Sequence, residues 1–196
     1  MGLRAGFIAR AGFLGIGIIA GLRPAPAIAR TCQAVAPILP SDELKEFRIH
    51  AFDLALNIPS NYRSMLRTDG HITFHDPGSF DLIQCLIRTG EYREIPLYAA
   101  LEVHSGIAPE EELADIIRIK RPWVDYYTPE YTPVEFAGRS GLRYEYTNEL
   151  YGISISNISF LSEAGDTLLT LTGPTVHPIM ADALSSLDPT ATVSDQ

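Results

Sequence analysis

The sequence predicts an α+β fold in which helices flank an antiparallel β-sheet. Strand-like segments of the last third follow one another with only a few turn residues between them: 134–136, 142–146, 151–161 and 167–172. Strands that are joined so closely pair antiparallel. Apolar residues recur at helical spacing in three other segments, 80–90, 113–120 and 176–187. Helices before and after a strand meander are typical of an α+β sandwich.

Three more strands are expected in the first half of the chain. Residues 52–58 alternate apolar with small or polar side chains, and the alternation ends at Pro59. A Thr-Asp-Gly turn at 68–70 precedes a short strand at 71–75, and the apolar run at 97–104 is typical of a buried strand. The order of the strands in the sheet does not follow from these patterns.

The expected helices carry signals at their ends. Asp76 followed by Pro77 is typical of a helix start, because aspartate caps free N–H groups and proline suits the first turn. Gly90 is suited to end that helix. Residues 109–112, one proline and three glutamates, predict the first turn of the next helix, where the helix dipole favours acidic groups. Pro122 bounds this second helix.

The chain begins with a basic segment that contains no acidic residue before Asp42. Residues 11–22 carry no charge and no hydrogen-bonding side chain, and Ala27-Ile-Ala29 is a small-x-small sequence. These are the parts of a secretory signal peptide, with cleavage expected after Ala29 or after Ala27. The alternatives are an uncleaved membrane anchor and an organelle transit sequence. The apolar run reaches only ~18 Å as a helix, against a hydrocarbon core of ~30 Å.

These patterns predict a signal peptide at 1–29, a linker at 30–46, a single α+β domain at 47–187 and a flexible tail at 188–196. Loss of residues 1–29 would remove three of the 15 basic residues and none of the 24 acidic ones, which changes the net charge from −9 to −12. We therefore expect an exported, acidic protein that does not bind nucleic acid, since nucleic-acid binding needs a basic face.

The chain has two cysteines, which are too few for a disulfide framework or a Cys-rich zinc module. Cys85 falls within the apolar helical pattern of 80–90, and this position favours a buried, unreactive thiol. The alternative is a Cys32–Cys85 disulfide, which an oxidising compartment permits.

Two stretches carry a family resemblance. The first is F-x-L-x-L-x-I-P-S-N-Y at 52–62, followed by a strand that ends in His-Asp-Pro at 75–77. The second is I-S-F-L at 158–161, from which Gly-Asp and 168–172 lead into the last helix. Over about Phe52–Leu187 the chain resembles the Mog1/PsbP-like (PsbP-domain) family.

The resemblance implies a Mog1/PsbP-like α/β/α sandwich in a protein of a thylakoid lumen or a periplasm. It also implies association with a membrane protein complex, which for PsbP-like proteins is photosystem II, and several of them act as assembly factors in photosynthesis. Two features depart from the family. Residues 80–90 have a helical pattern where that family has an extended strand, and Lys45 and Lys120 are the chain's lysines, too few for a lysine-rich docking patch.

Catalytic patterns are absent from the sequence. It contains no His-Glu-x-x-His and no Walker loop, and Gly138-Arg-Ser-Gly141 is one residue shorter than a Gly-x-Ser-x-Gly elbow. No nucleophile can be matched with a base. The sequence therefore predicts a protein that is not an enzyme.

Three residues are candidate ligands of a divalent metal, namely His75, Asp76 and His104, because histidine and carboxylate together suit zinc, manganese or copper. His71 cannot ligate the same ion as His75, since residues four apart in a strand lie ~13 Å from each other. The alternative, which we favour, is that Asp76 caps the helix that follows and that the histidines are ordinary strand residues. No other cofactor is expected.

The segment 123–133 contains the only tryptophan and is interrupted by prolines. Aromatic rings on a stiff loop bury area with little loss of entropy, so this segment is a candidate binding surface. Its residues, with two arginines that could join it, are Trp123, Tyr126, Tyr127, Tyr131, Arg139 and Arg143. The alternatives are that the rings pack over the end of a sheet and that the arginines pair across a hairpin.

The sequence thus predicts an exported, non-enzymatic accessory or assembly protein that binds a membrane protein complex, with photosystem II implied by the resemblance. The second hypothesis is a periplasmic or lumenal protein that binds a metal or a small ligand with His75 and Asp76. Contact with the membrane itself is expected only through an uncleaved signal anchor.

Overall fold

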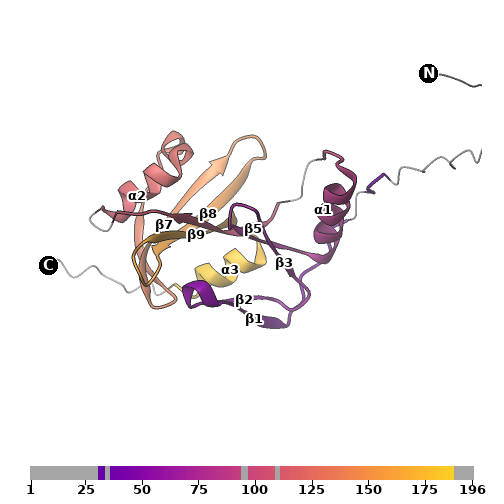
Figure 1. The fold of residues 1–196 in the computed structure, drawn as a ribbon, viewed down its shortest axis with the longest axis horizontal. Helices are drawn as coiled ribbons and strands as arrows, with labels where there is room; N and C mark the ends of the chain where they lie inside the picture. Colours follow the sequence, from indigo (N-terminus) through magenta and orange to yellow (C-terminus); the bar gives the residue numbers. More distant parts are fainter. Residues whose placement is uncertain (1–30, 34–35, 94–96, 109–110, 188–196) are drawn as a thin grey trace, which may run out of the picture. The chain divides into compact units, whose positions relative to one another are not determined.

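The computed structural model describes residues 31–187 apart from 34–35, 94–96 and 109–110. The predicted signal peptide, with its apolar run, and the predicted tail at 188–196 lie outside these residues. Among the described residues, no helix is long and apolar enough to cross a membrane. This part of the chain forms a seven-stranded sheet, a two-stranded sheet and three α-helices (Figure 1).

The large sheet confirms the predicted α+β class. Its strand order is β3-β4-β5-β9-β8-β7-β6, and all neighbours are antiparallel. The strands are β3 (Arg63–Leu66), β4 (Ile72–His75), β5 (Ala99–Ser105), β6 (Thr132–Phe136), β7 (Arg139–Asn148), β8 (Ile153–Leu161) and β9 (Thr167–Pro174). The strands predicted at 71–75, at 97–104 and in the last third are confirmed; β3 is an additional edge strand.

The small sheet pairs β1 (Leu44–Ile49) with β2 (Leu54–Pro59) through a 3₁₀ turn, η1 (His50–Phe52). The strand predicted at 52–58 is therefore confirmed as β2. The predicted boundary between linker and domain at 46/47 is wrong, because it falls inside β1. This strand is an edge strand whose first three residues are exposed. Its charged side chains hide the apolar alternation on which the prediction depended.

The segment before β1 is held to the domain and is not a free linker. Cys32 and Cys85 form a disulfide, so the free thiol favoured for Cys85 is wrong and the alternative is correct. Cys32 packs against Leu82 and Leu86 of α1 (Pro77–Thr89). The N–H of Ile38 also donates to Asp76 at 2.9 Å. The cysteines are 53 residues apart in the sequence, and the tertiary packing that joins them leaves no local signal.

The helices form where the apolar spacing predicts them. In α1, the Asp76 carboxylate accepts from the N–H groups of Gly78 and Ser79, and Gly90 ends the helix in a left-handed conformation with φ +69°, both as predicted. In contrast, α2 (Leu113–Lys120) begins after the glutamates predicted for its first turn, and Glu112 occupies the N-cap position.

The remaining helical segments are α3 (Pro178–Ser185), which confirms the C-terminal helix, and η2 (Pro122–Tyr127), a 3₁₀ helix in the aromatic segment.

One face of the large sheet is buried beneath α3 and the β1–β2 hairpin, which lie together below the sheet in Figure 1. The core between these layers is apolar, with contributions from Phe74, Leu101, Phe160, Leu171, Leu54, Ile58, Ile179 and Met180. Gly173 permits the close packing of α3, because a Cβ there would lie 3.0 Å from Ala99 and 3.2 Å from Met180. Alternation along each strand then directs the intervening side chains to the other face.

The second face of the sheet is covered at its ends. At one end, Ile116, Ile117 and Val124 of α2 and η2 pack on Tyr144 and Leu168. Figure 1 shows α1 far from α2, and α1 contacts β4. Within the described residues, the middle of this face between the two helices is open.

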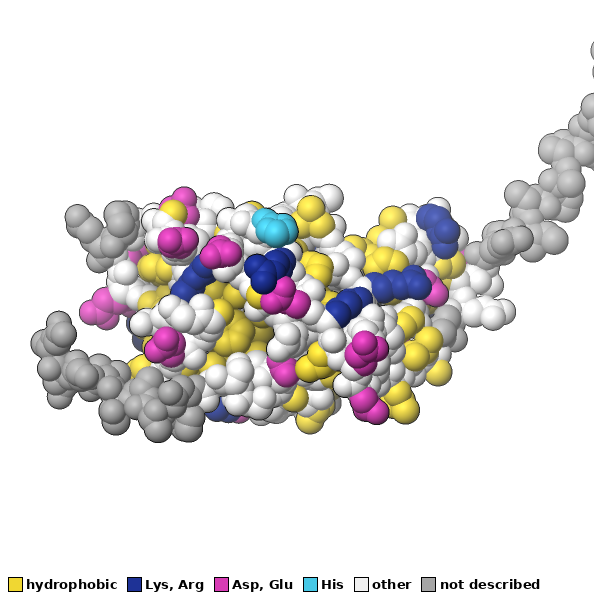
Figure 2. All heavy atoms as spheres, turned by 90° about the horizontal axis from the view of Figure 1, so that it is seen from below, with side chains coloured by type: hydrophobic (Ala, Val, Ile, Leu, Met, Phe, Trp, Pro, Cys, Tyr) yellow, Lys and Arg dark blue, Asp and Glu magenta, His cyan; other side chains and the backbone are white. Residues whose placement is uncertain are grey.

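Charge is spread over the surface. Figure 2 shows acidic and basic side chains interspersed on the face seen from below, with apolar side chains between them. On that face, the excess of acidic residues does not form a single patch.

Candidate functional site

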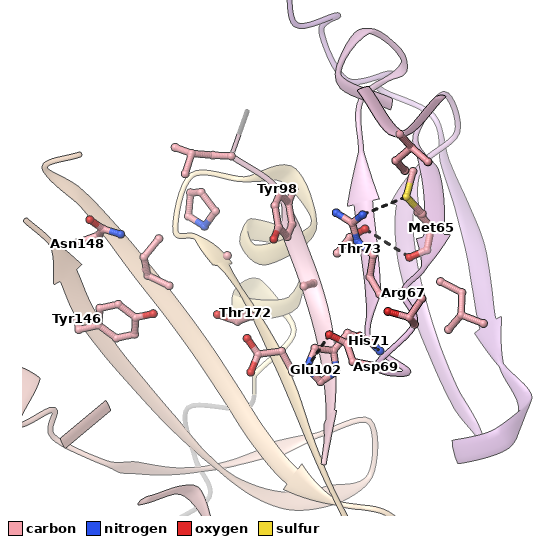
Figure 3. A pocket seen from close by; sticks show the side chains of 18 residues that line it. Met65, Arg67, Asp69, His71, Thr73, Tyr98, Glu102, Tyr146, Asn148 and Thr172 are labelled. Atoms are coloured by element: carbon pink, nitrogen blue, oxygen red, sulfur yellow. Dashed lines mark hydrogen bonds and ion pairs between the residues drawn. The ribbon is translucent and has the colours of Figure 1, made fainter. Parts of the chain in front are cut away.

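The open middle of the sheet forms a cleft of about 590 Å³, shown from close by in Figure 3. Its floor comes from β4, β5, β9 and β8 through Thr73, Ala100, Glu102, Thr172 and Ile155. On the β3 side, the wall is formed by Met65, Arg67, Asp69 and His71. On the other side the wall is formed by Tyr146 and Asn148 of β7, and Tyr98 closes the end towards α1.

The floor of the cleft carries polar side chains because alternate residues of the central strands are polar. In β9, Leu169 and Leu171 fill the apolar core, while Thr170 and Thr172 face the other way. The β5–β9 register puts Glu102 opposite Thr170 and Ala100 opposite Thr172, so these residues share one face. The same sequence alternation that builds the core therefore supplies the floor of the cleft.

The carboxylate of Glu102 is held by a buried guanidinium. Arg121 follows α2, its exposed fraction is 1%, and its Nε lies 2.8 Å from Oε2 of Glu102. This Nε contact is an ion pair without the alignment of a hydrogen bond. The same guanidinium donates to the hydroxyl of Tyr144 and, at 3.0 Å, to Oδ1 of Asn157. Arg121 thus crosses from the α2 end of the face to the floor of the cleft.

The hydrogen-bond network of Arg121 continues among the polar side chains of β8 and β9. Asn157 Oδ1 also accepts from the Thr172 hydroxyl at 2.7 Å, and Ser159 bonds to Thr170 at 2.7 Å. Such a network, with its members paired, holds polar side chains in one arrangement. The floor is therefore preorganised before any ligand arrives.

The ion pair sets the charge state of both partners. Burial opposes the charge of Glu102, but the hydrogen bond with His104 and the attraction of Arg121 outweigh it and hold the pKa of Glu102 below its usual value. For Arg121, burial lowers the pKa, but Glu102, Tyr144 and Tyr146 together more than compensate, so the pKa is raised. Both groups are charged at neutral pH.

Arg67 is the basic side chain of the cleft wall. Its Nη1 donates to the sulfur of Met65 at 3.4 Å, and sulfur is a weak acceptor. Among the described residues, no carboxylate lies within ion-pair distance of Arg67. Its guanidinium therefore has hydrogen-bonding capacity that the protein leaves unused.

The three candidate metal ligands are not brought together. His75 is buried and bonds through Nε2 to Thr73 at 2.8 Å, while Asp76 caps α1. His104 lies further along β5, 3.4 Å from Glu102 and with its ring centroid 5.1 Å from that of His71. In the described parts of the chain, no three His, Cys, Asp or Glu side chains are placed to hold a metal.

The candidate aromatic surface is partly packed and partly exposed. Tyr127 stacks on Tyr146 with ring centroids 4.4 Å apart, which extends the β7 wall of the cleft. Tyr131 packs edge-on against Tyr144 at 5.1 Å. Tyr126 is 85% exposed and Trp123 is 45% exposed. The centroid of the Trp123 ring lies 5.1 Å from Cζ of the Arg121 guanidinium.

The structure does not bring the two predicted arginines into this surface. Arg139 donates to the carbonyl oxygens of Phe52 and Asp53, so it joins the β6–β7 hairpin to η1. Arg143 forms an ion pair of 2.6 Å with Glu145 on its own strand. Odd-numbered residues of β7 point to the face opposite Tyr144 and Tyr146, which separates these arginines from the aromatic rings.

Other residues of the site carried little signal in the sequence. Glu102 is the only acidic residue in the apolar run 97–104, and a lone acid in a buried strand implies a charge partner. Nothing in the sequence marks Arg121 as that partner or Arg67 as a wall residue, because both positions depend on how distant strands pair.

Comparisons with known proteins do not assign the chain to a family. No protein-family profile and no curated protein matches it. A crystal structure of a protein from Bacteroides thetaiotaomicron VPI-5482 has a TM-score of 0.35 and 14% sequence identity over 68% of this chain. The chain covers 44% of that protein. A likeness of this degree carries no argument about fold or function.

The Glu102–Arg121 pair predicts a large effect of removing one charge. Glu102→Gln leaves a buried guanidinium without its carboxylate, and the free energy of unfolding should fall by about 3–5 kcal/mol. Urea unfolding followed by the fluorescence of Trp123 measures it. Asp115→Asn, which breaks the exposed pair with Arg118, is the control and should cost under about 1 kcal/mol.

The double variant Glu102→Gln/Arg121→Met should lose less free energy of unfolding than the two single variants, Glu102→Gln and Arg121→Met, lose in sum. In the double variant neither charge is left without its partner. Additive losses would show that the pair is not coupled.

The buried His75 and the half-buried His177 predict an acid-sensitive fold. Burial lowers the pKa of His75 and of His177 to about 4; the charge of Arg67 adds to the effect at His75, and Asp76 opposes it at both. The unfolded chain takes up these protons near pH 6.5, so it binds more protons than the folded protein between about pH 6.5 and 4. The free energy of unfolding therefore falls as the pH drops through this window.

For His75 the expected loss between pH 7 and 5 is about 2 kcal/mol. Urea unfolding at both pH values measures this fall in the free energy of unfolding. The fall should be smaller in His75→Gln than in the wild type. In His50→Gln it should equal that of the wild type, since His50 is exposed. Equal losses in the wild type and in His75→Gln would contradict the assignment.

Proposed function

We propose that the protein is an exported binding protein that holds a small amphipathic ligand on the open face of its sheet. The observation that carries this proposal is the cleft of about 590 Å³ between α1 and η2. Small-molecule sites have volumes of about 300–1,000 Å³, apolar walls and a few placed polar groups. The cleft fits this description in size, and its lining combines apolar side chains with polar groups.

The lining supports a binding role. The rings of Tyr98 and Tyr146 and the side chains of Met65 and Ile155 supply apolar contact, and Asn148 supplies polar groups at the rim. The network under Thr172 keeps the floor in place, which lowers the cost of ordering the site when a ligand binds.

The state of Glu102 supports binding over catalysis. Its pKa is held low by His104 and Arg121, so it is a weak proton acceptor at neutral pH. Export is supported by the signal-peptide pattern at 1–29 and by the Cys32–Cys85 disulfide, since disulfides persist in oxidising compartments such as a periplasm or a thylakoid lumen.

A blocked cleft tests the proposal. The side chain of Ala100 faces the cleft, and Ala100→Phe should fill the floor and weaken binding at least tenfold for ligands found in a library of small amphipathic molecules. Amide shifts in ¹H–¹⁵N NMR spectra report both the affinity and the residues affected, which should be those of the cleft.

The matched control is Ala181→Phe on the exposed side of α3, which should bind as the wild type does. Ligands that shift amides only outside the cleft, or that bind Ala100→Phe and wild type alike, would contradict the proposal.

A second candidate function is the docking of a membrane protein complex on the aromatic segment. The exposure of Tyr126 and Trp123 beside the cleft wall favours it, because Tyr and Trp are over-represented among residues that dominate binding energy. Photosystem II is the complex suggested by the sequence resemblance, and an accessory or assembly role would follow.

Affinity capture from solubilised membranes tests this second candidate. Trp123→Ala/Tyr126→Ala should lose the subunits of the complex that wild type retains, while Tyr92→Ala, which removes an exposed ring elsewhere, should keep them. Identical sets of captured proteins for the wild type and the double variant would refute it.

A further inference from the structure

We propose that the ligand of the cleft is an amphipathic organic anion, an apolar body that carries one carboxylate, and that Arg67 binds the carboxylate. This inference rests on the proposed function and adds the chemical class of its ligand. It is carried by the charge of Arg67, which has no ion-pair partner among the described residues, and by the apolar side chains that line the same cleft.

The charges of the cleft differ in how far the protein itself neutralises them. Glu102 already has Arg121 at 2.8 Å and His104 at 3.4 Å. Asp69 accepts from the backbone N–H of His71 and faces its ring at 3.9 Å. Arg67 has a sulfur as its side-chain acceptor and no ion pair within the described residues. The unmet requirement of the cleft is therefore an anion.

Arg67 is placed to bind a planar anion. Its backbone is fixed in the β3–β4 turn, where its N–H donates to His71 at 2.8 Å and its carbonyl accepts from Gly70 at 3.0 Å. Figure 3 shows its guanidinium beside Met65 on the β3 side of the cleft, across from Tyr146 and Asn148. A guanidinium presents several N–H donors in one plane and matches the two oxygens of a carboxylate.

Apolar side chains of large exposure also line the cleft. Ile87 is 62% exposed and Leu97 is 47% exposed, and both line the cleft with Tyr98. Covering them with the body of a ligand would remove apolar surface from water, which stabilises the complex in proportion to the area. One cleft thus contains both the anion site and apolar surface, as an amphipathic carboxylate requires.

The same arrangement disfavours the other ligand charges. A cationic ligand would find Glu102 already paired and would be repelled by Arg67. A neutral ligand would cover the guanidinium without giving it an acceptor, and a polar group that loses water without a partner costs free energy. A carboxylate satisfies both the charge and the hydrogen-bonding capacity of Arg67.

Three probes of equal chain length test the inference: octanoate, octanol and octylammonium. Each is titrated into the protein at millimolar concentration, and ¹H–¹⁵N amide shifts in the cleft give the affinity. We expect octanoate to bind about tenfold tighter than octanol, and octylammonium to bind no tighter than octanol. A charge-assisted hydrogen bond is worth about tenfold or more in affinity.

Variants assign the effect to one side chain. Arg67→Gln should weaken octanoate binding about tenfold and leave octanol binding within twofold, and Arg67→Lys should lie between Arg67→Gln and the wild type, because it keeps the charge without the planar fork. Arg63→Gln is the matched control: Arg63 is on β3, four residues before Arg67, pairs with Asp81 and lies over Phe80, outside the cleft lining. It should bind octanoate as the wild type does.

Equal affinities for octanoate and octanol, or no effect of Arg67→Gln on octanoate, would overturn the inference while the cleft remains a binding site. Failure of all three probes to shift cleft amides would overturn it as well. The library ligands blocked by Ala100→Phe test the proposed function separately, so the two can fail independently.

Discussion

The pairing of β5 with β9 is the constraint on which the rest of the structure depends. It joins the first half of the chain to the C-terminal meander and makes one seven-stranded sheet from two separate sets of strands. The pairing also sets which residues share a face. Leu101 and Leu171 meet in the core, while Glu102, Thr170 and Thr172 meet on the open side. The core and the cleft are thus two consequences of one register.

The open face of the large sheet is stabilised by pairs of polar side chains, whereas the face beneath α3 is covered by apolar packing. Arg121 links α2 to Glu102, and Asn157 links Arg121 to Thr172, so the cover at one end and the floor in the middle hold each other in place. Replacing such a pair by apolar residues is often neutral for stability. The polar floor is therefore better explained by a function for that face than by the stability of the fold.

Local patterns were sufficient to predict the class of the fold and most of its elements. The caps of α1, the strand alternation of β2 and the closely joined strands β7, β8 and β9 are encoded by neighbouring residues. The charged edge strand β1, the Cys32–Cys85 disulfide and the Glu102–Arg121 pair depend on contacts between distant segments, and no local pattern encodes them. For the site, the aromatic segment could be predicted as a feature, but its junction with the cleft through Tyr127 and Tyr146 could not.

A crystal structure of the protein with the tightest-binding library ligand tests the central claim most directly, namely that the open face of the sheet is the binding face. The account predicts that the ligand lies over Ala100 and Thr172, between Tyr98 and Tyr146. A ligand bound on the side of the sheet that α3 covers, or on the aromatic segment outside the cleft, would contradict it.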